Sequence, residues 1–314
     1  MKKPLSNTEV DIRVQQLRGN IFIEYSDTRR VACLIQNAVS EFLAAKELGY
    51  QHDARGIVVL GRSGSGKTAS VQHALVNLGL PPSSIGDSPR HQLFVPLRDD
   101  VTLRRLRMLI SLEFGWTPKA RESAEEIWQY VTQYIDRLQT HVIVLDEIQH
   151  VRAAGPKDKK SMRDALKSLV QPQRGQVVPI LIGMPEFEEL LNSDQQFKRR
   201  YSVVHMTNLD AAVDAKKAIQ VLARYCKEVG VELGDSVKTR DFAERLLHAS
   251  HYAFGEMCSI CILAIKTALI AQADEITIEH FREAHALRFD CVGDMNPFLA
   301  RDFLRIPASI EPDF

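Results

Sequence analysis

The stretch GRSGSGKT, from Gly61 to Thr68, has the residue types and spacing of a loop that holds phosphate groups. Its glycines allow consecutive backbone N–H groups to turn inward and form a nest for an anion. A lysine directly before a hydroxyl residue adds a charge for the phosphate oxygens and an oxygen ligand for Mg²⁺. We therefore expect a nucleotide site with Mg²⁺, formed by Gly61, Arg62, Ser63, Gly64, Ser65, Gly66, Lys67, Thr68 and Ala69.

Two consecutive acids, Asp146 and Glu147, end the apolar stretch VIVLDE. A carboxylate at the end of a buried strand beside the phosphate loop can hold Mg²⁺ through water, and a second one can orient and deprotonate an attacking water. A protein that only binds the nucleotide needs only the first acid, so the pair predicts hydrolysis. The alternative is that Glu147 merely caps the segment that follows.

Short apolar runs that alternate with helical patterns must position these residues. Four runs are typical of buried strands: GIVVL, HQLFVPL, VIVLD and VVPILIGMP. Their alternation with helices predicts an α/β fold with a parallel sheet that is covered on both faces. After about Leu209 only helical patterns follow. We therefore expect a helical segment (1–53), a nucleotide-binding domain (54–208), a small all-α domain (209–290) and a tail (291–314).

The composition is ordinary for a globular protein, because 45% of the 314 residues are hydrophobic and 25% are charged. The 40 basic and 40 acidic residues balance, so no global field demands nucleic acid, although a local basic patch is compatible with this balance. We find neither a signal peptide nor an apolar run near the ~20 residues of a membrane span. Five sparse cysteines fit a reducing compartment, so we expect a cytoplasmic protein with no membrane partner.

The order of these motifs resembles that of an AAA+ ATPase: GRSGSGKT, then VIVLDEIQH, then FKRRY, then a helical lid. More narrowly, the chain resembles the TniB/TnsC group of transposition ATPases, which are relatives of MuB. The narrower resemblance rests on DEIQH at 146–150 and on GDMNPFLARDF at 293–303, and it covers about Ile21 to Phe303. It implies the P-loop AAA+ fold with a small all-α lid, and it implies ATP and Mg²⁺ as cofactors.

The resemblance also implies a function and partners. In this group ATP drives the assembly of a ring or helical filament on double-stranded DNA of any sequence. The filament marks a target site and recruits the transposase, and hydrolysis takes the filament apart. The implied partners are therefore double-stranded DNA, a transposase and further copies of the chain, and the resemblance allows a target-selector protein as well.

AAA+ sites lie between subunits, and the resemblance places the arginine that reaches the neighbour's γ-phosphate at Arg200, with Arg199 next in line. Arginine suits this role because its guanidinium stays charged and binds phosphate oxygens through a fixed fork. The alternative is a pair of solvated arginines before an edge strand. The resemblance also makes Tyr25 a candidate neighbour of the adenine, with an ordinary core position as the alternative.

Two basic stretches are candidates for contacts with DNA. LRDDVTLRRLRM lies where this group places its DNA-facing helix, and RAAGPKDKKSMR follows the acidic pair. Cations along a filament groove would contact phosphates without reading sequence. The alternative is a solvated helix face whose charge is offset by Asp99 and Asp100. The candidate residues are Arg98, Thr102, Arg104, Arg105, Lys157, Lys159, Lys160 and Arg163.

Two departures from the AAA+ pattern bear on hydrolysis. The tip of the fourth strand, Ile182-Gly183-Met184-Pro185, has no polar side chain where a sensor residue is usual, and Gly255-Glu256-Met257 stands where the lid arginine is usual. They predict slow basal turnover that a partner stimulates. They also keep two alternatives open: a replication-initiator-like or signalling AAA+ ATPase, and a nucleotide-gated scaffold with little hydrolysis.

Overall fold

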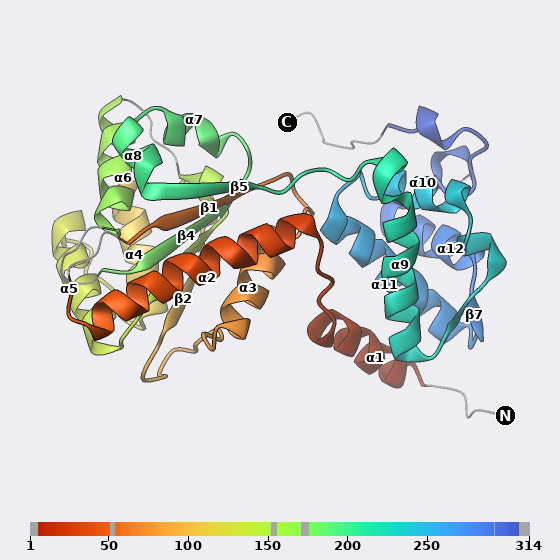
Figure 1. The fold of residues 1–314 in the computed structure, drawn as a ribbon, viewed down its shortest axis with the longest axis horizontal. Coiled ribbons are helices and arrows are strands. Elements are labelled where there is room, and N and C mark those ends of the chain that lie inside the picture. The colour runs from red at the N-terminus through yellow and green to blue at the C-terminus, as the bar shows by residue number, and fades with distance from the viewer. Residues whose placement is uncertain (1–5, 51–53, 152–155, 171–175, 292, 308–314) are drawn as a thin grey trace. The chain divides into compact units, whose positions relative to one another are not determined.

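The computed structural model describes residues 6–50, 54–151, 156–170, 176–291 and 293–307 (Figure 1). The chain divides into two compact units. The sheet unit comprises Tyr25–Arg62 and Lys67–Met206, and the helical unit comprises Met1–Glu24, Ser63–Gly66 and Thr207–Phe314.

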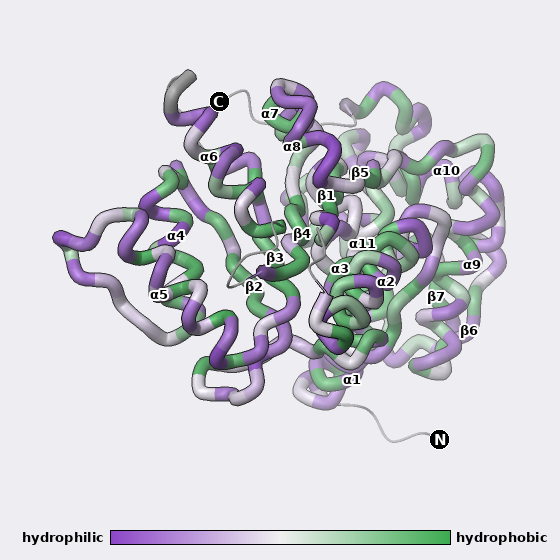
Figure 2. The backbone as a smooth tube through the Cα atoms, turned by 60° about the vertical axis from the view of Figure 1, so that its left-hand side comes forward, coloured by the Kyte–Doolittle hydropathy of each residue, from purple (hydrophilic) through white to green (hydrophobic). Residues whose placement is uncertain are grey.

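A parallel five-stranded sheet forms the centre of the sheet unit, in the order β2-β3-β4-β1-β5. All residues of β1, β3 and β4 are buried, as expected for central parallel strands, and the central strands are coloured green along most of their length in Figure 2. β5 follows Arg200 at one edge, beyond the four strands that the apolar runs predict. The strands are β1 (Gly56–Leu60), β2 (Gln92–Pro96), β3 (Val142–Asp146), β4 (Val178–Gly183) and β5 (Tyr201–His205).

Helices cover both faces of this sheet, as Figure 1 shows. Val58 and Leu60 belong to a hydrophobic cluster with side chains of α4, α5 and α6. Ile57 and Val59 point to the opposite face, where α2 and α3 pack, and they are fully buried too. The predicted α/β fold with a covered parallel sheet is therefore confirmed. The helices are α2 (Ser26–Glu47), α3 (Lys67–Asn77), α4 (Leu103–Glu113), α5 (Ala124–Arg137), α6 (Pro156–Ser168), α7 (Phe187–Asn192) and α8 (Gln195–Arg200).

The helical unit is built around α11, whose residues are largely apolar and buried. Helix α1 packs against α11 and α9, and the Asp11 carboxylate pairs with the Lys266 ammonium at 2.7 Å. The N-terminal stretch 1–53 thus contributes α1 to this unit and α2 to the sheet unit. The helices are α1 (Asn7–Asn20), α9 (Ala211–Val229), α10 (Arg240–Ala249), α11 (Phe254–Ile270) and α12 (Ile278–Phe289).

The helical unit also contains a short parallel ladder between β6 (Glu232–Leu233) and β7 (Glu275–Ile276). The expectation that strand structure stops after about Leu209 is therefore wrong in this detail. Each strand has only two residues. Such a run is too short to produce an alternating pattern, so the sequence carries no signal for it.

The tail after α12 is anchored on the helical unit through its described residues. Asn296 is 2% exposed, and its side-chain amide donates to the carbonyl of Arg282 at 2.9 Å. Phe298 is buried too, and its backbone N–H donates to Oδ1 of Asn296 at 3.0 Å. The Arg245 guanidinium donates to two tail carbonyls, each at 2.7 Å, and lies 4.7 Å from the centre of the Phe303 ring. The tail includes two short 3-10 turns, η3 (Gly293–Met295) and η4 (Phe303–Arg305).

Candidate nucleotide-binding site

The two ends of the phosphate loop that belong to the sheet unit, Gly61–Arg62 and Lys67–Thr68, meet the acidic pair at the C-terminal edge of the sheet. Leu60, before the loop, is paired with Gly183 of β4, and Leu145, before the acids, is paired with Leu181. The C-terminal ends of parallel strands share one edge, which is where open α/β sheets bind ligands. Only β4 separates the loop after β1 from the acids after β3.

The loop leads from β1 directly into α3. Gly64 and Gly66 have φ angles of 73° and 90°, in the left-handed region that glycine adopts without steric cost. The ammonium of Lys67 donates to the carbonyls of Gly61 and Arg62 at 2.8 and 2.9 Å. The first turn of α3 contributes partial positive charge. The loop therefore has the shape and polarity that a phosphate chain requires.

Lys67 lies in a partly desolvated position that faces negative charge. Its residue is 6% exposed, and this burial lowers the pKa of the ammonium. The carboxylates of Glu147, Asp146 and Glu186 act in the opposite direction. A buried cation is costly unless it is paired, so the site favours an anionic ligand at this lysine.

Thr68 and Asp146 form the second part of the site. The Thr68 hydroxyl donates to Oδ2 of Asp146 at 2.9 Å, although the two residues are 78 positions apart. Burial raises the pKa of the Asp146 carboxyl, and the hydrogen bonds from Thr68 and from the Glu147 backbone act against this rise. A hydroxyl and a carboxylate are the hard oxygen ligands that Mg²⁺ prefers. These two side chains therefore fit a bound Mg²⁺.

The described residues contain no group of three His, Cys, Asp or Glu side chains that could hold a metal ion. Mg²⁺ does not require such a group, because it usually binds one or two carboxylates and completes its shell with substrate phosphates and water. Burial raises the pKa of the Cys258 thiol to about 12, so this sulfur stays protonated at neutral pH.

Glu147 is exposed and follows Asp146 in a left-handed backbone conformation, with φ 60° and ψ 46°. This conformation is uncommon for a residue other than glycine. Glu147 precedes the 3-10 turn η1 (Ile148–His150) and its side chain does not cap that turn. Its backbone N–H donates to Oδ1 of Asp146 at 3.0 Å. The carboxylate is therefore presented at the sheet edge.

Gln149 is a polar residue of the site that the sequence singles out only as part of DEIQH at 146–150, with no role of its own. Its Oε1 accepts a hydrogen bond from the backbone N–H of Met184 at 3.1 Å, and its Nε2 donates to Oε2 of Glu147. A polar side chain thus reaches the tip of β4, although residues 182–185 have none. The position of Gln149, two residues after Glu147, is the only sequence signal for this contact.

Arg199 and Arg200 lie near the N-terminal ends of the strands, opposite the end that carries the phosphate loop. Tyr201, which follows Arg200, is paired with Gly56 at the start of β1, whereas the phosphate loop follows the end of β1. A five-residue strand spans roughly 16 Å, so Arg200 is remote from the phosphate loop of its own chain. Arg200 is half-buried and donates to the carbonyl of Lys167 at 3.3 Å, and Arg199 is exposed.

Tyr25 lies at the start of α2 and is 2% exposed. Its backbone N–H donates to the Thr28 hydroxyl at 2.8 Å. This burial is what an ordinary core position would show, and it leaves little of the ring surface accessible to an adenine.

The two basic stretches lie on neighbouring elements of the sheet unit. Helix α4 contacts α6, and Val101 pairs with Val151 in an isolated parallel bridge. Five of the eight candidate residues are exposed. These are Arg98, Thr102, Arg105, Lys159 and Lys160.

Two of the basic candidates are engaged in internal hydrogen bonds. Arg104 donates to the carbonyls of Ala120 and Glu122 at 2.9 and 3.1 Å, and Arg163 donates to the Ser193 hydroxyl at 2.7 Å. Exposed Thr102 caps the N-terminus of α4. The side chain of Lys157 lies outside the described residues. Arg98, Arg105, Lys159 and Lys160 are therefore the exposed candidate cations, and the last three lie on helices α4 and α6.

Within the helical unit, Ser63–Gly66 lies against the start of α11. The backbone N–H of Glu256 donates to the carbonyl of Gly64 at 2.9 Å. A Cβ on Gly255 would lie 2.7 Å from that carbonyl oxygen, so position 255 requires glycine. The Glu256 carboxylate is paired with Arg288 at 2.6 Å. Residues 255–257 thus offer no cation to the loop, as their sequence indicates.

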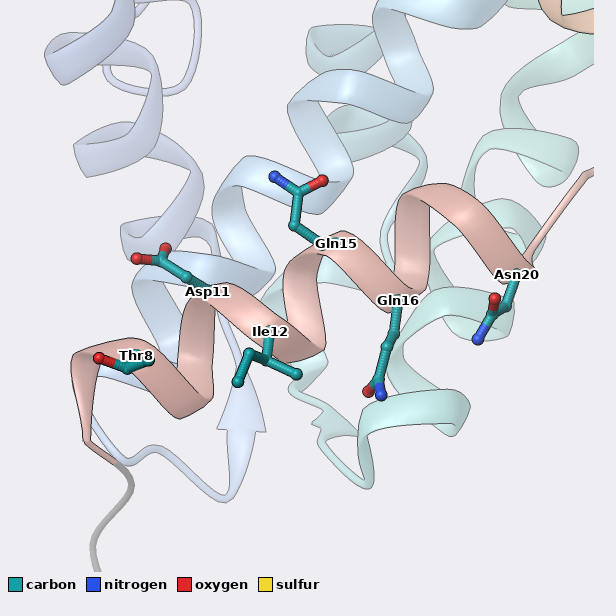
Figure 3. Close-up of a pocket in the computed structure, with 6 residues that line it drawn as sticks. All are labelled: Thr8, Asp11, Ile12, Gln15, Gln16 and Asn20. Carbon is teal, nitrogen blue, oxygen red and sulfur yellow. The ribbon is translucent and has the colours of Figure 1, made fainter. Parts of the chain in front are cut away.

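A hollow of about 510 Å³ runs along α1 (Figure 3). All of its lining residues come from this one helix, and none is a cation. An open face of a single helix does not enclose a ligand. The lining residues are Thr8, Asp11, Ile12, Gln15, Gln16 and Asn20.

None of the described helices alone combines the length and apolarity of a membrane span. Only α10 and α11 taken together meet both criteria, and they are bent by 112° at the break between them.

Comparisons with known proteins agree with this geometry. Residues 50–191 match the family model described as AAA domain, and none of the curated proteins matches the chain. Cdc6p from Pyrobaculum aerophilum is similar in structure, with a TM-score of 0.57, 12% identity, and coverage of 89% of this chain and 72% of that one. The Orc2 protein of Aeropyrum pernix, in its ADP form, has a TM-score of 0.53, 15% identity, and coverage of 90% and 75%.

The Orc1 protein of Aeropyrum pernix, solved in complex with DNA, has a TM-score of 0.55, 20% identity, and coverage of 83% of this chain and 64% of that one. The chain thus spans less than two thirds of Orc1. At these identities the likeness concerns the fold. The phosphate loop, the acidic pair and the covered parallel sheet, together with the AAA domain over residues 50–191, identify the fold of this chain as the P-loop AAA+ fold.

Proposed function

We propose that this protein is an ATP-hydrolysing switch that acts on DNA. The observation that carries the proposal is the meeting of Thr68, Asp146 and Glu147 at the sheet edge beside the phosphate loop. Lys67 binds the β- and γ-phosphates, and Thr68 and Asp146 hold Mg²⁺. When bound, Mg²⁺ neutralises the charge on the phosphates, and Glu147 orients the attacking water and accepts its proton.

A second copy of the chain completes the site in this proposal. Arg200 is remote from the phosphate loop of its own chain but lies at a sheet edge, half-buried and held by the Lys167 carbonyl. In a ring or filament its guanidinium reaches the γ-phosphate of the neighbouring subunit. Assembly and hydrolysis are then coupled, because each active site needs two subunits.

Double-stranded DNA is the ligand that we assign to the exposed cations Arg105, Lys159 and Lys160. Cations that lie on neighbouring helices can contact successive phosphates without reading bases. The DNA in the similar Orc1 structure supports a nucleic-acid ligand for this fold.

The process that we propose is DNA transposition, because DEIQH at 146–150 and GDMNPFLARDF at 293–303 resemble the TniB/TnsC group. ATP-bound subunits assemble on target DNA and recruit a transposase, with a target-selector protein as a further partner. Hydrolysis then releases the assembly.

A second candidate function is that of a replication-initiator-like ATPase. The observation that favours it is the structural likeness to Cdc6p, Orc1 and Orc2. The two candidates share the nucleotide site and differ in how they bind DNA. A target-selecting filament grows along any duplex, whereas an initiator forms a compact assembly at a preferred site.

Fluorescence anisotropy with two unrelated duplexes, at several salt concentrations, tests the proposal. Binding is expected to require an ATP analogue rather than ADP, to be equal for both duplexes and to weaken with salt. The triple substitution Arg105→Ala, Lys159→Ala and Lys160→Ala should weaken binding to both duplexes equally and flatten the salt slope by about one unit per lost phosphate contact. The matched control on α9 is Lys216→Ala, Arg224→Ala and Lys227→Ala, which removes the same charge.

Negative-stain imaging separates the two candidates. Assemblies that lengthen with the duplex support transposition, and assemblies of fixed size on a preferred duplex support the initiator-like function. DNA binding that is indifferent to the nucleotide would contradict both, because neither a filament switch nor an initiator would then be controlled by ATP.

A further inference from the structure

We infer that Gln149 is a positioning residue for Glu147 and supplies the polar group that the tip of β4 lacks. The inference rests on the proposed hydrolytic role of Glu147. The turn after β3 thus provides the polar contact to Glu147 that no side chain of residues 182–185 can provide.

The hydrogen bonds of Gln149 determine which way its amide points. The backbone N–H of Met184 can only donate, so the group of Gln149 that faces it at 3.1 Å must be the oxygen, Oε1. The NH₂ group is then directed to Oε2 of Glu147, as the structure has it. One carboxylate oxygen is thereby held, and the carboxylate keeps its second oxygen for a water molecule.

Gly183 provides the space for this amide. A Cβ at position 183 would lie 2.6 Å from Cγ2 of Ile148 and 2.9 Å from Oε1 of Gln149. The carbonyl of Gly183 also accepts a hydrogen bond from the N–H of Gly61 at 3.2 Å. Gly183 thus connects the start of the phosphate loop to the tip of β4, and Gln149 connects the tip of β4 to the Glu147 carboxylate.

Glu147 needs such a contact because it is exposed. An exposed glutamate populates several rotamers, and an acid–base group acts efficiently only when it is within hydrogen-bond reach of the proton that it takes. A displacement of about 1 Å can cost ~100-fold in rate. Holding one carboxylate oxygen restricts the side chain before the nucleotide binds.

Two substitutions of similar length separate positioning from a purely structural role. Gln149→Glu keeps the acceptor for the Met184 N–H but replaces the donor to Glu147 with a like charge, whereas Gln149→Met removes both hydrogen bonds. If Gln149 positions Glu147, Gln149→Glu should lower kcat by about 10- to 100-fold and Gln149→Met somewhat less, with little change in the KM for ATP. If Gln149 only supports the β4 tip, Gln149→Glu should be close to the parental protein and Gln149→Met should be worse. Gln129→Glu, at an exposed position on α5, is the matched control.

A second measurement uses the resting protein and needs no turnover. In ¹H–¹⁵N spectra the side-chain amide of Gln149 is assigned by its loss in Gln149→Met. Glu147→Gln should shift this resonance but not that of Gln92, whose Nε2 donates to Gln72 at 2.9 Å elsewhere in the unit. An unmoved Gln149 resonance would overturn the inference.

The kinetic outcomes distinguish the inference from the proposed function. Turnover that Glu147→Gln abolishes but Gln149→Glu leaves at the parental kcat overturns the inference alone. A parental protein that hydrolyses no ATP, with or without DNA, overturns the proposed function together with the inference.

Discussion

The two units of this chain bury polar groups in different ways. In the sheet unit, Lys67 and Asp146 are 6% and 8% exposed and face each other's charge near the ends of parallel strands. In the helical unit, His285 and Asn296 are as deeply buried, but they are partnered within the core. Burial shifts the pKa of Lys67 and Asp146 in the sheet unit and that of His285 in the helical unit. Burial alone therefore does not make a site.

The difference arises from the way the elements end. Parallel strands bring several chain segments to one edge, so the loop after β1 and the acids after β3 converge there. The helices of the helical unit bury their polar groups along their length, where backbone carbonyls and neighbouring side chains satisfy them. Convergence of opposite charges at an open edge, rather than burial, marks the nucleotide site.

The largest effect is expected from Lys67→Ala. ATP binding and hydrolysis should become undetectable, because the substitution removes the only lysine that the loop offers to the phosphates. Lys266→Ala, in the helical unit, is the control: its ion pair with Asp11 is partly exposed, so its loss should leave nucleotide binding unchanged. Titration calorimetry with ATP and Mg²⁺ measures both. Tight binding by the Lys67 variant would show that the contrast between the units does not identify the site.

A somewhat smaller effect is expected from Arg200→Ala. This variant should bind ATP normally but lose about 10³-fold in turnover, the lower end of the contribution of an arginine that stabilises phosphoryl transfer. Arg224→Ala, on an exposed part of α9, should retain parental activity.

Mixing Arg200→Ala with Glu147→Gln tests whether the site is shared between subunits. Some interfaces in the mixture would pair an intact Glu147 with an intact Arg200, so partial activity should return. Mixed oligomers that remain inactive would contradict a shared site, and an active Arg200→Ala protein that depends on Arg199 would move the role by one residue.

The smallest effect concerns the pH dependence of stability in the helical unit. The pKa of His285 is lowered from its usual 6.5 to about 4. Burial is the largest cause, and the charges of His251 and Arg288 lower this pKa further. Between these two values the unfolded chain binds the proton and the folded chain does not. The free energy of unfolding should therefore fall as the pH is lowered through this range.

The measurement is urea unfolding followed by far-UV circular dichroism, which reports both units. The comparison is His285→Phe, which should lose less stability than the parent on acidification. Burial also lowers the pKa of His141, in the sheet unit, to about 4. The control is therefore His141→Phe, and its unfolding is followed by tryptophan fluorescence. Both tryptophans, Trp116 and Trp128, lie in that unit. Equal acid sensitivity of the parent and His285→Phe would show that this histidine does not titrate as described.

Much of the candidate site could be predicted from local patterns. The phosphate loop consists of consecutive residues, so its glycines, lysine and threonine can be recognised directly in the sequence. The apolar runs before Gly61 and Asp146 predict buried strands. The parallel sheet follows from the alternation of strands and helices. All of these are properties of short segments, so the sequence by itself determined them.

Other features depend on partners that are distant along the chain, and only the tertiary structure decided them. The sequence shows arginines at 104, 105 and 107, but the carbonyls of residues 120 and 122 engage Arg104, whereas Arg105 is exposed. Likewise, Gln149 becomes part of the site only because β4 brings the N–H of Met184 to the turn after β3. A hydrogen bond requires a partner within about 3 Å, and which distant segment comes that close is decided by the packing of the whole unit.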